Sequence, residues 1–121
     1  MGDTKGFVDN VGIEVSGEQA ILHTGPEHEN SSGGIQGGLI ATLLDIAMGR
    51  KTRAAFGQDA TIVTLQLSVT YLNAAKPGDV LTARAELGKK GTSVAMLRAD
   101  VVDAEGTEIA HGVGTFMVKG D

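Results

Sequence analysis

The segment from Gln36 to Ala55 constrains the fold most, because it is apolar over a longer stretch than one strand can use. Its apolar side chains include positions 39, 40, 43, 44, 46, 47 and 48 and do not form a single narrow stripe. A helix that is apolar all round is a buried helix. Arg50, Lys51 and Arg53 lie near the expected C-terminus, where cations complement the helix dipole. The sequence therefore predicts one long buried helix.

Residues 61–73, 80–87 and 95–101 alternate apolar and polar residues, as half-buried β-strands do. A fourth strand is predicted at residues 108–118, which are small and apolar at both parities, as in a strand covered on both faces. Residues 11–15 and 19–23 suggest a further hairpin. The turns between the four later strands contain Gly or Pro and are too short for a crossover helix, so we expect an antiparallel meander. The prediction is an α+β fold in which a curved antiparallel sheet wraps a central helix. With no linker visible, residues 1–121 are expected to form one domain.

Composition removes several function classes. The chain has 15 acidic and 10 basic residues, a formal charge of −5 and only 3% aromatic residues, so it lacks the basic surface and stacking residues of nucleic-acid binders. It has no cysteine and no apolar stretch long enough to span a bilayer, which favours a soluble cytoplasmic protein. His23, His28 and His111 lack the spacing of a metal motif, so no metal site or cofactor is expected.

The aromatic content also bears on assembly. The chain contains no Trp, one Tyr and three Phe, so its core consists mainly of aliphatic side chains. These side chains bury less area per residue than aromatic ones do. We therefore expect association of chains to add burial.

Asp45 is the most informative polar residue, because it lies in the third turn of the predicted buried helix. A buried carboxylate is costly unless it is paired or neutralised, so its presence indicates either catalysis or a structural hydrogen bond. The glycine-rich run from Gly33 to Gly38 precedes this helix. It would let a ligand approach the backbone N–H groups at the positive helix end, or would simply allow close packing. Lys89 and Lys90 form a small basic spot in a predicted turn, suited to phosphates or to plain solvation.

Three segments together resemble the PaaI-type thioesterases of the hotdog-fold superfamily, over nearly the whole chain. They are residues 28–30, residues 36–45 and the strand ending at residues 69–72 before the turn at 76–79. The family has an Asn, a His-Gly-Gly six residues later and an acidic residue nine beyond that His. Asn30, Gln36 and Asp45 keep that spacing.

The resemblance implies a hotdog fold and hydrolysis of acyl-CoA thioesters, with Asp45 as general base or as nucleophile. The N–H of Gly37 would hold the thioester oxygen, and Asn30 would position the carbonyl or the water. Thr64 would help to hold the attacking water from the facing protomer. Gln36 and Gly38 would contact the substrate.

The resemblance also bears on assembly and on the ligand. The CoA phosphates would lie near Lys89, Lys90 and Gly91. Family members are dimers, often paired into tetramers, with active sites at the dimer interface. A homodimer, and from it a homotetramer, is therefore expected for this chain.

Gln36 departs from the family pattern, which has His at this position. Glutamine forms hydrogen bonds but cannot carry a proton near neutral pH. Two functions therefore stay open: hydrolysis of a small aromatic or short- to medium-chain acyl-CoA, or binding of acyl-CoA or a related thioester without turnover.

Overall fold

The computed structural model describes residues 6–119. The predicted long helix is α2, which spans Gly37–Phe56 and so lies one residue from the predicted bounds. Gln36 is its N-cap residue, and Gly57 follows it with a φ of 125°, a backbone conformation that favours glycine. The other elements are α1 (Phe7–Val11), the 3₁₀ turn η1 (Pro26–His28) and the strands β1 (Ile13–Ser16), β2 (Gln19–His23), β3 (Thr61–Tyr71), β4 (Val80–Lys90), β5 (Val94–Val102) and β6 (Glu108–Lys119).

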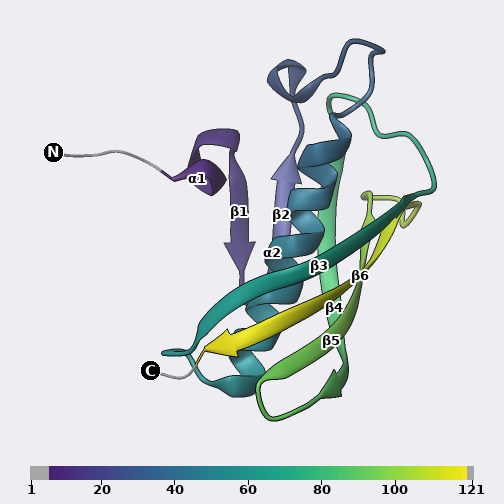
Figure 1. Ribbon diagram of the computed structural model, residues 1–121. Helices are drawn as coiled ribbons and strands as arrows, with labels where there is room; N and C mark the ends of the chain where they lie inside the picture. Colours follow the sequence, from purple (N-terminus) through teal and green to yellow (C-terminus); the bar gives the residue numbers. More distant parts are fainter. Residues whose placement is uncertain (1–5, 120–121) are drawn as a thin grey trace, which may run out of the picture.

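The six strands form one antiparallel sheet in the order β1-β2-β4-β5-β6-β3. The long strands curl around α2, and Figure 1 shows β3 and β6 crossing the helix obliquely. The prediction of a helix wrapped by a curved antiparallel sheet is thereby confirmed.

The predicted four-stranded meander is wrong in one respect. Strands β4, β5 and β6 follow one another, but β3 pairs with β6, and β2 takes the place beside β4. The connection 72–79 runs past the start of α2, where Ile35 N–H donates to the carbonyl oxygen of buried Ala75 at 2.9 Å. This anchored connection is long enough to carry the chain across the sheet and not into a hairpin.

The core lies between α2 and the concave face of the sheet. Leu43, Leu44, Ala47 and Met48 of α2 are fully buried. Gly114 of β6 lets the sheet approach them closely, because a Cβ there would lie 3.0 Å from the Phe116 ring and 3.1 Å from the Met48 methyl group. Small residues in the strand therefore allow the helix to pack directly against the sheet.

One side of α2 is only partly covered by its own chain, which corrects the prediction of a helix buried all round. Gly38 is exposed, and Thr42, Asp45, Gly49 and Arg53 are half-buried. These five residues are spaced three or four positions apart and so lie on one stripe of the helix surface. We call this set the open stripe. Ile46, beside it, is also only half-buried.

The strand β3 forms the other unpartnered feature. Within the described residues it pairs only with β6, so its second edge is free. Its ladder is interrupted between Thr64 and Gln66 by a bulge, and Leu65 there is 52% exposed. An edge strand of 11 residues with exposed apolar side chains is a surface suited to pairing with another chain.

Candidate active site

Asp45, on the open stripe, forms a hydrogen-bonded pair with Thr64 of β3. The Thr64 hydroxyl, from β3, donates to Oδ1 of Asp45, with 2.7 Å between the two oxygens. The carboxylate is half-buried, which corrects the expectation of full burial. Among residues 6–119, its second oxygen accepts no hydrogen bond. One carboxylate oxygen is thus fixed by Thr64, and the other is available to a water molecule or a ligand.

A pocket of about 230 Å³ surrounds this pair. Its walls are formed by Ile46, Ile62 and Phe116, and by Gly49, Arg50 and Arg53 further along α2. The pocket is therefore apolar beside the carboxylate and cationic toward the C-terminal end of the helix.

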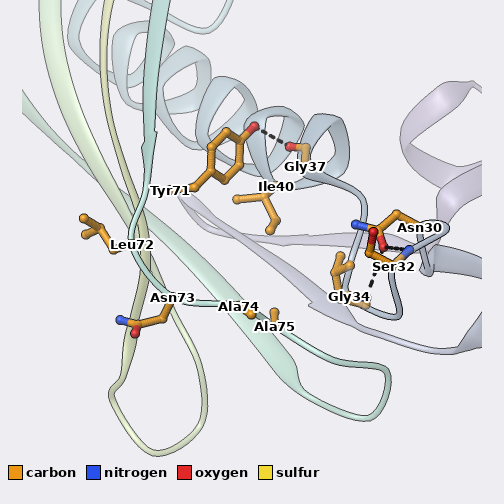
Figure 2. Close-up of a pocket in the computed structure, with 11 residues that line it drawn as sticks. Asn30, Ser32, Gly34, Gly37, Ile40, Tyr71, Leu72, Asn73, Ala74 and Ala75 are labelled. Carbon is orange, nitrogen blue, oxygen red and sulfur yellow. Dashed lines mark hydrogen bonds between the residues drawn. The ribbon is translucent and has the colours of Figure 1, made fainter.

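Asn30 lies in the loop that leads into α2, and its side chain is held by that loop. Its Oδ1 accepts hydrogen bonds from Ser32 N–H at 2.8 Å and from Gly34 N–H at 3.1 Å, as Figure 2 shows. Because both partners are donors, the amide oxygen must face the loop and the NH₂ group must point away from these two groups. Asn30 can therefore donate a hydrogen bond to a ligand in the pocket that it lines.

Gly37 begins α2 and lines the same pocket, which has a volume of about 470 Å³. The N–H groups of Gly37 and Gly38 point out of the helix start, and within the described part of the chain they have no acceptor. Such N–H groups at the positive end of a helix stabilise a developing oxyanion. The loop fixes this helix start, since Gln36 N–H donates to the His28 carbonyl oxygen at 2.9 Å.

Tyr71 is a site residue that the sequence analysis missed. Its hydroxyl donates to the Gly37 carbonyl oxygen at 2.6 Å, and its ring lies between the end of β3 and the first turn of α2 (Figure 2). A Cβ at position 37 would lie 3.3 Å from this hydroxyl, which gives Gly37 a packing reason to be glycine. Tyr71 is the only tyrosine in the chain and ends an apolar run. These two features are the sequence signal that could have identified it as a site residue.

The predicted catalytic residues thus form two half-sites. One half-site contains Asn30 and Gly37, and the other contains Asp45 and Thr64. Gly37 and Asp45 are eight residues apart on one helix, about 12 Å along its axis. A single chain therefore does not bring all four residues to one reaction centre.

The predicted substrate-binding residues lie at two other places. Gln36 and Gly38 line a pocket of about 630 Å³ with His28, Phe7 and Leu39 among its walls. Lys89 and Lys90 are exposed at the end of β4, so the predicted turn begins later than expected, at the exposed Gly91. There the Lys90 ammonium lies 4.6 Å from the centre of the Phe56 ring, a cation–π contact. None of the pockets described here includes these three residues.

Three residues could in principle hold a metal ion. Ligand atoms of Asp100, Glu108 and His111 lie within 4.8 Å of one another on the outer side of β5 and β6. His111 Nδ1 and Asp100 Oδ1 are 2.8 Å apart, so a hydrogen bond between cross-strand neighbours already accounts for their approach. The expectation of no metal stays a prediction.

Among the described residues, no helix combines the length and apolar character needed to cross a membrane.

The sequence comparisons point to one family. A family model described as the thioesterase superfamily matches residues 33–110. The chain is 37% identical over 102 residues to a proposed esterase of Halobacterium salinarum, covering 78% of this chain and 66% of that protein. It is 34% identical over 91 residues to human acyl-coenzyme A thioesterase 13, covering 71% of this chain and 61% of that protein. The matches therefore span less than two thirds of either relative.

The solved structures agree on the fold. A Bacillus halodurans protein solved with CoA has a TM-score of 0.84 at 28% identity, covering 93% of this chain and 74% of that one. A conserved Pseudomonas aeruginosa protein has a TM-score of 0.87 at 25% identity, covering 96% and 95%. The Escherichia coli PaaI protein of the phenylacetic acid degradation operon shares the fold, with a TM-score of 0.83 at 19% identity over 93% and 83%. These likenesses confirm the predicted hotdog fold and the PaaI-type resemblance. The family model covers more than half of this chain, including Gly37 and Asp45. The chain therefore belongs to the thioesterase superfamily.

Proposed function

We propose that this chain is an acyl-CoA thioesterase whose active site combines the two half-sites of neighbouring chains in a homodimer. The observation that carries the proposal is the carboxylate of Asp45, which Thr64 orients on a helix face that its own chain leaves open. Family membership and the CoA-bound structure of the Bacillus halodurans protein support the reaction and the ligand class.

In this mechanism the thioester carbonyl lies in the pocket of Asn30 and Gly37. The N–H of Gly37 and the NH₂ group of Asn30 donate to the carbonyl oxygen as negative charge develops on it. Asp45 of the facing protomer takes a proton from water while the water oxygen bonds to the carbonyl carbon. The carbon–sulfur bond then breaks, and the CoA sulfur receives the proton, which leaves a free acid and CoA.

A second route fits the same groups. Asp45 attacks the carbonyl carbon itself, releases CoA and forms a mixed anhydride, which water then hydrolyses. Both routes need an ionised Asp45 and the same oxyanion donors. In both, the hydrogen bond from Thr64 fixes the reacting carboxylate.

The dimer follows from two surfaces that one chain leaves unpartnered. Pairing of β3 edges would continue the sheet from one chain to the next, and it would bring the open stripe of α2 toward its partner. The expected arrangement, a dimer that pairs further into a tetramer, rests on this geometry and on the family resemblance. The exposed lysines at the end of β4 are proposed to contact CoA phosphates.

The acyl group is proposed to be a small aromatic or a short to medium chain. Gly49 lines the pocket beside Asp45 and has no side chain, and Ala41 and Thr42, one turn earlier on α2, are also small. The apolar walls formed by Ile46, Ile62 and Phe116 suit such a group.

The decisive experiment compares wild type with Asp45→Asn on a broad panel of acyl- and aryl-CoA thioesters, with released thiol as the readout. We expect wild type to release thiol and Asp45→Asn to release almost none, with unchanged circular dichroism. Asp59→Asn, at an exposed position outside every pocket described, is the matched control. A wild type that releases no thiol from the whole panel, or an Asp45→Asn variant of undiminished rate, contradicts the proposal.

A second candidate is a protein that binds acyl-CoA without hydrolysing it. Gln36 favours this candidate, because the family has a histidine there. It predicts CoA binding that Asp45→Asn leaves unchanged, together with no thiol release by wild type.

A further inference from the structure

The pocket of Asp45 ends in a guanidinium group that has no partner among the described residues. Arg53 lines this pocket, and within residues 6–119 its side chain makes no hydrogen bond and no ion pair. Its Nε atom is buried and unsatisfied. Leaving a buried donor of a charged group unpaired costs free energy. We therefore expect a ligand to provide a hydrogen-bond acceptor for Arg53.

The surrounding charges do not supply that acceptor. Glu18, the acid that shares a neighbouring pocket with Arg53, is paired with Lys51 at 3.0 Å. Asp45 accepts a hydrogen bond from Thr64 and forms no ion pair with Arg50 or Arg53 among the described residues. Arg50, which lines the same two pockets, adds a second positive charge, and its Nη2 donates to the Gly17 carbonyl oxygen at 3.3 Å. The C-terminal end of the pocket therefore has an uncompensated positive charge.

The helix geometry connects this charge to the reacting carboxylate. Asp45, Gly49 and Arg53 are four residues apart, so they follow one another on the open stripe. Helical side chains lean toward the N-terminus, which directs the Arg53 side chain back toward Asp45. Gly49 between them has no side chain, and a Cβ there would only just contact the Phe116 ring at 3.7 Å. A continuous lane thus runs from Asp45 over Gly49 to Arg53.

We propose that this lane binds the distal part of the acyl group and that Arg53 selects acyl groups ending in a carboxylate, such as short dicarboxylic acyl-CoA thioesters. This inference rests on the proposed thioesterase function and specifies its substrate. Ile46, Ile62 and Phe116 contact the methylene groups, and the guanidinium pairs with the terminal carboxylate, which it matches in charge and planar geometry.

The test uses two thioesters that differ at the far end of the acyl chain, glutaryl-CoA and valeryl-CoA. We expect wild type to have the higher kcat/KM on glutaryl-CoA. Arg53→Met, which keeps the aliphatic part of the side chain, should lower the ratio of the two kcat/KM values by about 10- to 100-fold, the typical effect of losing a charge-assisted hydrogen bond. Arg53→Lys should restore part of the ratio. Arg84→Met, which removes an exposed cation of β4 outside every pocket described, should leave the ratio at the wild-type value.

A binding measurement separates this inference from the proposed function. Dissociation constants of both thioesters are measured with Asp45→Asn and with Asp45→Asn/Arg53→Met, neither of which is expected to consume them. Tighter binding of glutaryl-CoA that disappears in the double variant supports the lane even if wild type shows no turnover. Equal binding of the two thioesters, or a preference that Arg53→Met does not change, overturns the inference and leaves the hydrolase proposal intact.

Discussion

The hydroxyl of Tyr71 donates a 2.6 Å hydrogen bond to the carbonyl oxygen of Gly37, which ties the end of β3 to the first turn of α2. Gly37 also provides the backbone N–H that is proposed to hold the substrate oxygen. Strand β3 also provides Thr64, the partner of Asp45. One edge strand therefore positions a member of each half-site.

Tyr71→Phe removes only this hydrogen bond. We expect kcat to fall by about 10-fold, because even a small misplacement of an oxyanion donor raises the activation barrier. The free energy of unfolding should fall by about 1 kcal/mol. Thiol release and urea denaturation measure the two effects. Thr70→Val, at an exposed neighbouring position of β3, is the control. An unchanged kcat would show that Tyr71 has no part in positioning Gly37.

Thr64→Val removes the hydroxyl that orients Asp45 but keeps the shape of the side chain. We expect kcat to fall by about 10- to 100-fold, since the lost hydrogen bond has a charged acceptor. KM should change little, because in the proposed mechanism Thr64 contacts Asp45 and not the substrate. Thr64→Ser keeps the hydroxyl and should retain most of the activity. Equal rates for the Val and Ser variants would argue against an orienting role.

Mixed dimers test whether the two half-sites act across an interface. Asn30→Ala and Asp45→Asn chains should each be almost inactive alone. Co-refolding them in equal amounts should restore about a quarter of the wild-type rate, because half of the dimers then contain one intact site out of two. Asn30→Ala mixed with a double Asn30→Ala/Asp45→Asn chain is the control and should stay inactive. Absence of recovery in a mixture shown to form heterodimers would place each site within one chain.

Gly114→Ala tests the close packing of β6 on α2. The added methyl would meet Phe116 at 3.0 Å and Met48 at 3.1 Å, so we expect a loss of about 1–3 kcal/mol in the free energy of unfolding. Gly38→Ala, where a Cβ meets no atom within 4 Å, should be neutral or slightly stabilising. Urea denaturation of both variants measures the difference. A Gly114→Ala variant as stable as Gly38→Ala would contradict this account of the packing.

The local elements were predictable because their patterns are local. Apolar continuity placed α2 within one residue, alternation located β3 to β5, and a run of small apolar residues located β6. Alternation shows which residues share a face but carries no information on which strand lies alongside. The pairing of β3 with β6 depends on the route of residues 72–79 across the helix start, and it was therefore missed.

The candidate site was predictable in part. The family resemblance identified Asn30, Gly37 and Asp45 as a set, but it could not show that one chain divides them between two pockets. The exposure of Asp45 was also misjudged. Apolar Ile46 next to it looks the same in sequence whether its own chain or another chain covers it. Tyr71 and Arg53 have no motif, and their importance appears only from the atoms that lie around them.

Under the proposed function, the division of the reactive groups between two pockets would make turnover a collective property. A lone chain would hold complementary parts of two different reaction centres and complete neither of them. Specific activity should consequently decline on dilution once the chains separate, although every molecule remains folded.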